Sequence, residues 1–276
     1  MHNFRKLAFI GGGNMAGALV GGLVKRGVAA SHLVVADPSP DQLQRLQRDY
    51  GIAITVDNAA AVKDAEVVVV AVKPQQMRHV AQSLATALAI SRPLVISVAA
   101  GIPHAALSRW LGIGVPVVRT MPNRPALNGF GATGLYAPES VGAAHRALAE
   151  TIMAAVSATV WVDHESQMDT VTALSGSGPA YFFLFMEALE AAARERGLPA
   201  EVAHQLTLET AFGAAQMARQ SADSLATLRE QVTSKGGTTA AALAVLDAAG
   251  LRAIVAHAVA AADRRSAELG AEFAAP

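Results

Sequence analysis

The residues best suited to chemistry lie late in the chain, in the string Val-Thr-Ser-Lys-Gly-Gly-Thr-Thr at positions 232–239. An Ala- and Leu-rich run follows and predicts a helix over residues 239–248. The first turn of a helix has unpaired backbone N–H groups at the positive end of the helix dipole. Such groups favour a small carboxylate, so Gly236, Gly237 and Thr238 predict an anion pocket. An ordinary capped helix start is the structural alternative.

A second candidate is the glycine-rich turn near the start of the chain. The apolar run Leu7–Ile10 leads into Gly11-Gly12-Gly13-Asn14-Met15-Ala16, which matches the dinucleotide-binding pattern G-x-G-x-x-A. In that pattern Gly11 permits the tight turn, Gly13 lets the backbone approach a pyrophosphate, and Ala16 allows close packing of helix on strand. Any tight strand-to-helix turn can produce this glycine spacing. The β/α series that follows favours NAD(P) binding by residues Ile10 to Met15.

Three polar positions are candidates for contacts with the cofactor's adenosine half. Asp37 follows the predicted strand Leu33–Ala36, where an acidic residue usually binds the ribose hydroxyls of NAD. A carboxylate there repels the additional phosphate of NADP, whereas Ser39 could donate to that phosphate and Asp37 could simply cap the turn. The choice between NADPH and NADH therefore stays open, leaning toward tolerance of NADH. Asn58 either caps a helix or contacts the adenine side.

Other cofactor candidates end later strands. Val72, Lys73 and Pro74 leave a predicted strand at the carboxyl edge, where ligands bind in parallel sheets. Lys73 either contacts the cofactor ribose or phosphates or is a solvated loop lysine. Ala99 and the string Met121-Pro122-Asn123 end strands on the same edge and are predicted to line the nicotinamide.

These candidates require a sheet that brings strand ends together. Up to about residue 163, β-type runs alternate with helical stretches such as 41–50 and 75–89, which predicts the α/β class with a doubly wound, mainly parallel sheet. A Rossmann-like dinucleotide-binding domain is expected over residues 1–163. The predicted strands are Leu7–Ile10, Leu33–Ala36, Val67–Val72, Leu94–Val98, Val115–Thr120, Gly134–Ala137 and a run near Val160–Val162.

After Glu165 the strand signal ends, and residues 164–276 are predicted to form an all-helical substrate and dimerisation domain. The run Tyr181–Met186 is apolar on all sides of a helix, so it must be covered all round. A homodimer with a shared helical core is predicted; the alternative is one central helix wrapped by its neighbours. The predicted helices are Met168–Arg196, Pro199–Gln220, Ser224–Val232, Thr239–Ala248 and Leu251–Leu269.

The composition bears on partners and compartment. Of 276 residues, 52% are hydrophobic and 16% are charged, so disorder is not expected. Lysine plus arginine equals aspartate plus glutamate at 22 each, with no basic run, so neither nucleic acid nor a membrane surface is an expected partner. Cysteine is absent and the N-terminus lacks a signal-peptide core, which suits a cytoplasmic protein. The eight histidines form no ligand cluster, so no metal is expected.

The segment 172–181, expected to face the nicotinamide, contains neither lysine nor histidine. Oxidation of a hydroxy acid needs such a group to accept the alcohol proton. A protonated imine relaxes that demand, because its carbon is already electrophilic. The site must then bind the carboxylate through backbone amides and hydrogen-bond the ring nitrogen, which makes Thr239 the predicted catalytic residue. Gly176, Gly178 and Pro179 disfavour a regular helix here and indicate either a site or close packing.

Two of these strings, Leu-Ser-Gly-Ser-Gly-Pro-Ala-Tyr at 174–181 and the one at 232–239, closely resemble signature segments of the pyrroline-5-carboxylate reductases. The strings at 9–15, 72–74 and 121–123 are similar to the same family in the same order, so the resemblance covers nearly the whole chain. It implies reduction of 1-pyrroline-5-carboxylate to L-proline by NADPH or NADH, the last step of proline biosynthesis. It also implies an intertwined homodimer that can assemble into a larger ring.

Carried over by position, the resemblance implies cofactor contacts at Gly11–Met15, Asn58, Val72 and Lys73. It implies a substrate site formed by Glu165, Ser234, Gly237, Thr238 and Thr239, with Thr239 on the ring nitrogen. Two residues depart from the family's pattern and bear on the loop shape and on affinity. Lys235 stands where proline is common and adds a charge beside the carboxylate pocket, and Arg124 stands where threonine is usual.

Two other functions fit parts of the sequence. A β-hydroxyacid dehydrogenase has a similar two-domain plan, but the segment 172–181 lacks the lysine or histidine it needs. A nucleotide-sensing protein without catalysis explains the first glycine-rich turn and leaves the second glycine-rich string unexplained.

Overall fold

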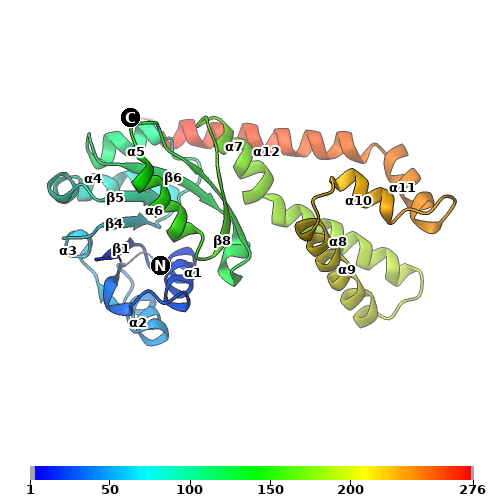
Figure 1. Ribbon diagram of the computed structural model, residues 1–276, viewed down its shortest axis with the longest axis horizontal. Coiled ribbons are helices and arrows are strands. Elements are labelled where there is room, and N and C mark those ends of the chain that lie inside the picture. The colour runs from blue at the N-terminus through cyan, green and yellow to red at the C-terminus, as the bar shows by residue number, and fades with distance from the viewer. Residues whose placement is uncertain (1–3, 275–276) are drawn as a thin grey trace. The chain divides into compact units, whose positions relative to one another are not determined.

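The computed structural model describes residues 4–274 and contains an eight-stranded sheet in the order β3-β2-β1-β4-β5-β6-β7-β8 (Figure 1). Neighbouring strands are parallel except β6 and β7, which are antiparallel. The α/β class with a mainly parallel sheet is therefore confirmed. The strands are β1 (Leu7–Ile10), β2 (Leu33–Ala36), β3 (Ala53–Thr55), β4 (Val67–Val70), β5 (Leu94–Ser97), β6 (Val117–Pro122), β7 (Gly131–Tyr136) and β8 (Ser157–Trp161).

Helices cover both faces of the sheet, which is why β1, β2, β4 and β5 are buried along their whole length. Side chains alternate between the faces: Val67 and Val69 pack on the first face, Val68 and Val70 on the second. The first face is covered by α1 (Asn14–Lys25), α2 (Pro40–Tyr50) and α6 (Ala143–Met153). The second is covered by α3 (Asn58–Val62), α4 (Pro74–Ser91) and α5 (His104–Leu111).

Some element boundaries differ from the prediction. The strand predicted over Val67–Val72 ends at Val70, while β7 and β8 each begin three residues earlier than predicted. The edge strand β3 was not predicted, because it has three residues and none is buried. Two short 3₁₀ turns, η1 (Ala30–His32) and η2 (Arg124–Asn128), also lack a clear sequence signal.

The single helix predicted over Met168–Arg196 was wrong, because three elements replace it. These are α7 (Gln167–Val171), a π-helical turn η3 (Thr172–Gly176) and α8 (Gly178–Glu195). The turn closes through the Ser177 N–H, which donates to the Thr172 carbonyl at 2.9 Å, the i→i+5 bond of a π-helix. Pro179 has no N–H to continue the ladder across this point. The remaining helices are α9 (Ala200–Gln220), α10 (Leu225–Gln231), α11 (Thr238–Ala248) and α12 (Leu251–Ala274).

The chain divides into two compact units, one formed by Met1–Ser177 together with Ala261–Pro276 and the other by Gly178–Ala260. This division differs from the boundary predicted near 163–165. One reason is that Val171 of α7 packs closely on Gly134 of β7. Another is that the end of α12 belongs to the first unit, where Phe273 packs against the core of the second sheet face.

In the helical unit, α8 and α9 pack against each other, yet their apolar side chains are largely uncovered. Phe182, Phe183 and Leu184 are exposed at 71%, 63% and 67%. Within residues 4–274 no single helix is long and apolar enough to cross a membrane, and by length and composition alone one pair, α11 with α12, bent by 53°, passes that test.

Candidate active site

The turn between β1 and α1 has the geometry of a dinucleotide-binding turn. Gly11 has φ +98°, and a Cβ there would lie 2.7 Å from the Ala71 carbonyl oxygen, so only glycine fits. Around Gly13, by contrast, a Cβ would have no atom within 4 Å. Helix α1 starts at Asn14 without a side-chain cap, so its first N–H groups are available to an anion.

A cleft of about 610 Å³ follows the carboxyl ends of the strands beside this turn. It lies where the strand order reverses between β1 and β4, the position at which ligands bind in doubly wound sheets. The cleft is lined by seven of the predicted cofactor residues, Ile10, Gly11, Gly13, Asp37, Asn58, Val72 and Lys73. The others, Gly12, Asn14, Met15, Ser39, Pro74 and Ala99, do not line it.

The cleft also has a wall that was not predicted, formed by Gln76, His79 and Val80 of α4. Their i, i+3, i+4 spacing places them on one face of that helix, directly after Lys73. This spacing is the signal by which the sequence could have revealed them.

Asp37 both caps its own turn and lines the cleft. One carboxylate oxygen, Oδ2, accepts the Gly12 N–H at 2.7 Å, and Oδ1 accepts the Ser39 N–H at 2.8 Å. Ser39 is itself the N-cap of α2, where its Oγ accepts the Gln42 N–H at 3.5 Å. The two roles considered for Asp37 are therefore compatible, since the backbone bonds hold a carboxylate at the edge of the cofactor cleft.

A second cavity, of about 420 Å³, continues along the same edge, because Gln75 lines both hollows. Its walls include Pro74, Ala100 and Gly101, together with Thr172 of η3 and Ser266 of α12. Ala99 itself is 4% exposed, so its neighbours present the lining surface.

Met121 and Asn123 line neither of these two cavities. They hold η3 against the sheet instead. Asn123 Nδ2 donates to the Ser175 carbonyl at 3.1 Å, and its Oδ1 accepts the Ala132 N–H at 2.9 Å. A Cβ on Gly176 would come within 2.5 Å of the Met121 side chain. Close packing therefore accounts for Gly176.

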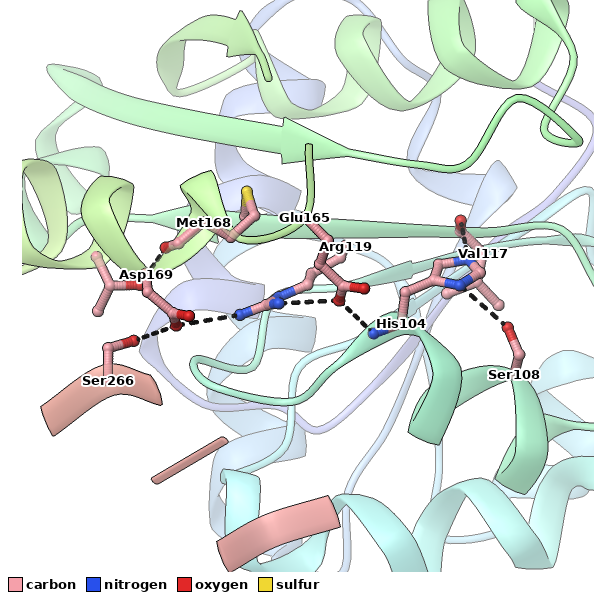
Figure 2. Close-up of polar contacts among 9 residues, drawn as sticks. His104, Ser108, Val117, Arg119, Glu165, Met168, Asp169 and Ser266 are labelled. Atoms are coloured by element: carbon pink, nitrogen blue, oxygen red, sulfur yellow. Dashed lines mark hydrogen bonds and ion pairs between the residues drawn. The ribbon is translucent and has the colours of Figure 1, made fainter. Parts of the chain in front are cut away.

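Glu165, a predicted substrate residue, belongs to a network of charged groups (Figure 2). Its Oε1 accepts a bond from Arg119 Nη1 at 2.9 Å and another from the backbone N–H of His104 at 2.5 Å. Arg119 Nη2 lies 3.9 Å from Asp169 Oδ1, which accepts the Ser266 hydroxyl at 2.7 Å. Arg119 was not predicted; an arginine inside an apolar strand was the available signal.

The His104 ring lies beside this network. One ring nitrogen, Nε2, is 3.2 Å from the Val117 carbonyl oxygen, and the ring packs edge-on against Tyr136. Burial lowers the pKa of His104, against the opposing effect of Glu165. Burial therefore favours the neutral form of the ring.

The residues predicted to form an anion pocket lie at the start of α11. Helix α11 begins at Thr238, and its N-cap, Gly237, supplies no side-chain cap. Gly236 has φ +70°, and the Gly237 N–H donates back to the Ser234 carbonyl at 3.0 Å. Thr238 is exposed and Thr239 is half-buried in the first turn. Lys235 is exposed beside them.

The doubly wound sheet, the uncapped glycine turn and the cleft at the switch point define a dinucleotide-binding protein of the kind that includes the nicotinamide-dependent oxidoreductases. Two family profiles agree with this class. "Pyrroline-5-carboxylate reductase dimerisation" matches residues 165–269, and "NADP oxidoreductase coenzyme F420-dependent" matches residues 6–101.

Individual relatives match over nearly their full length. The pyrroline-5-carboxylate reductase of Pseudomonas aeruginosa is 50% identical over 268 residues, which are 97% of this chain and 98% of that protein. The solved structure of the Coxiella burnetii reductase has a TM-score of 0.94 at 43% identity, covering 97% of this chain and 99% of that one. The Plasmodium falciparum enzyme, solved with NADP bound, has a TM-score of 0.84 at 29% identity, covering 98% and 99%.

The chain belongs to the pyrroline-5-carboxylate reductase family. Its activity is the reduction of 1-pyrroline-5-carboxylate to L-proline with NAD(P)H, and it carries that family's dimerisation domain. The predicted activity and cofactor class are thus confirmed, in preference to a hydroxyacid dehydrogenase or a non-catalytic sensor.

Proposed function

We propose that the start of α11 is the carboxylate pocket of this reductase, formed by Ser234, Gly236, Gly237 and Thr238, with Thr239 on the ring nitrogen. The observation that carries the proposal is the uncapped helix start. Because Gly237 offers no side-chain oxygen, the N–H groups that follow it are available to an anion at the positive end of the dipole. The left-handed φ of +70° at Gly236 suits glycine and supports the bend.

In this proposal the protein mainly orients its substrate. The amides hold the carboxylate and thereby fix the face that the ring presents. The Thr239 hydroxyl oxygen accepts the N–H of the protonated imine, which favours the electrophilic form of the C=N carbon. When bound, the reduced nicotinamide supplies the hydride. No lysine or histidine is needed, in keeping with their absence from segment 172–181.

The test is the substitution of Thr239→Val, which keeps the shape of the side chain and removes the hydroxyl. We expect kcat/KM for 1-pyrroline-5-carboxylate to fall by about 100-fold, the size of effect seen for one lost polar contact at a reacting centre. Thr239→Ser keeps the hydroxyl and should stay within a few-fold of the parent enzyme. The dissociation constant of the cofactor should not change in either variant. Full turnover in Thr239→Val would remove Thr239 from the mechanism.

For the cofactor, we propose that the first amides of α1 bind the pyrophosphate beside Gly11–Met15. Support comes from the free start of α1 and from the open space around Gly13. The adenosine half is then bounded by Asp37, Asn58 and Lys73, which line the cleft. Because Asp37 holds a carboxylate there, we propose that this enzyme accepts NADH readily and discriminates against the additional phosphate of NADPH.

We propose that the enzyme works as a homodimer joined through α8 and α9, whose apolar side chains are uncovered in one chain. This dimer would be the building block of any larger ring. We also propose a cytoplasmic location, which the absence of cysteine and the use of a reduced nicotinamide cofactor support.

A further inference from the structure

We propose that Glu165, held in place by Arg119, is a positioning residue for hydride transfer. It fixes the loop 98–103 between β5 and α5, and this loop borders the cavity that continues the cofactor cleft. The inference rests on the proposed function and on the prediction from the sequence that the nicotinamide lies at that edge of the sheet. It assigns to Glu165 an effect on the reaction that passes through the protein backbone and needs no contact with the substrate.

Arg119 holds Glu165 in position. Its side chain is 5% exposed, and a cation so deeply buried requires carboxylate partners. Strand alternation directs Val118 to the face covered by α6, which places Arg119 on the opposite face, beside α5. Its two carboxylate partners, Glu165 and Asp169, both come from the segment that follows β8 (Figure 2).

Glu165 supplies the missing cap of α5. The N-cap of α5 is Pro103, which has no side-chain acceptor, and His104 is the first helical residue. Glu165 Oε1 accepts the His104 N–H across 61 residues of sequence. A carboxylate at a helix N-terminus is also favoured by the helix dipole. The first turn of α5, and the loop leading into it, are therefore fixed by a side chain from a distant element.

The loop 98–103 also packs closely against α12. Gly101 has φ +76°, and a Cβ on Gly270 of α12 would lie 2.8 Å from the Gly101 carbonyl oxygen. Ser266, one turn earlier on α12, donates to Asp169, the second partner of Arg119. The same charged network thus holds both the start of α5 and the helix against which the loop packs.

The position of this loop matters because Ala100 and Gly101 line the cavity beside the cofactor cleft. Hydride transfer depends on reacting atoms held about 3–3.5 Å apart, and a misplacement of about 1 Å can cost roughly 100-fold in rate. Loss of the α5 cap would loosen the nicotinamide side of the site while leaving the pyrophosphate turn intact.

The experiment compares Glu165→Ala with Glu165→Gln in the intact enzyme. Glutamine keeps an acceptor oxygen for the His104 N–H, whereas alanine removes it. We expect kcat to fall at least tenfold in Glu165→Ala, with a larger deuterium isotope effect from 4-deuterated NADH and an unchanged dissociation constant for NADH. Glu165→Gln should recover kcat to within about threefold.

Arg119→Met should also lower kcat, because it removes the charged partner that holds Glu165 in place. Combining it with Glu165→Ala should reduce kcat no further than the worse single change. Arg146→Met is the matched control. Arg146 is likewise an arginine held by hydrogen bonds, but its partners are backbone oxygens, at Ala137 and Val141, and it lies on α6 at the other face of the sheet. We expect it to lower the melting temperature and leave the isotope effect unchanged.

Three results would overturn the inference. One is an unchanged kcat in a folded Glu165→Ala enzyme. Another is an isotope effect that rises equally in Arg146→Met. The third is an equal rise of KM for the imine in both Glu165 variants, which would indicate direct contact with the substrate. A silent Thr239→Val beside an impaired Glu165→Ala would remove Thr239 from the mechanism and leave the positioning role of Glu165 standing.

Discussion

The side chain of Asp37 stabilises a backbone turn and also lies where it can affect the cofactor preference. Its two oxygens accept backbone N–H groups from Gly12 and Ser39, so the negative charge is held at a fixed point beside the cofactor cleft. From Asp37 to Gln44 the sequence contains two acidic residues and no basic one. The basic residues lining the cleft, Lys73 and His79, belong to the β4–α4 connection and to α4. A 2′-phosphate near Asp37 would therefore meet a like charge without a compensating cation from β2 or the start of α2.

We predict that Asp37→Ser shifts the cofactor preference toward NADPH. The ratio of the dissociation constants, NADPH over NADH, should fall by about tenfold or more, which corresponds to roughly 1.4 kcal/mol. Serine can still accept one of the two backbone N–H groups, so the turn should keep its shape. Titration of each reduced cofactor by fluorescence, without substrate, measures the ratio directly. A ratio that does not move would exclude Asp37 as the determinant.

At the scale of elements, the local sequence pattern predicted an element correctly where the residues of that element alone determine its limits. Strands β1 and β2 match their predicted limits, because each is an apolar run bounded by turn residues. The start of α11 was predicted within one residue from its glycine pair. The turn η3 was not predicted as such, although Gly176, Gly178 and Pro179 disfavour a regular helix at that point. The partnership of Arg119 and Glu165, which lie 46 residues apart, is likewise a product of the fold.

The turn between β1 and α1 allows a test of the cofactor site that leaves the fold unchanged. Because a Cβ at Gly13 would have no atom within 4 Å, Gly13→Val should fold normally and project its methyl groups into the space proposed for the pyrophosphate. We expect NADH binding to weaken by at least 100-fold, with a melting temperature within a few degrees of the parent. Gly11→Ala is the contrasting change, since its Cβ would collide with the Ala71 carbonyl and destabilise the turn. Unaltered NADH affinity in Gly13→Val would contradict the assignment of the turn.

At the scale of the whole molecule, a single chain leaves part of its own core uncovered. Helix α8 has one buried residue, Gly178, although its sequence is rich in phenylalanine and leucine. Helix α9 adds Phe212, which is 58% exposed. Burying one such side chain contributes roughly 1.5–3 kcal/mol, so a surface of this kind strongly favours association with a second copy. The match of residues 165–269 to the reductase dimerisation domain supports the same conclusion.

We therefore predict that Phe182→Glu combined with Phe183→Glu prevents dimer formation, because two carboxylates on each chain would have to be buried without partners. Light scattering coupled to size-exclusion chromatography should show the mass of a monomer, and reductase activity should fall with the loss of dimer. Phe130→Glu is the matched control: its side chain is 70% exposed, like that of Phe182 at 71%, but it precedes β7 in the sheet-containing unit. This control should retain the mass of the parent enzyme. An unchanged mass in the double variant would show that the dimer is built on another surface.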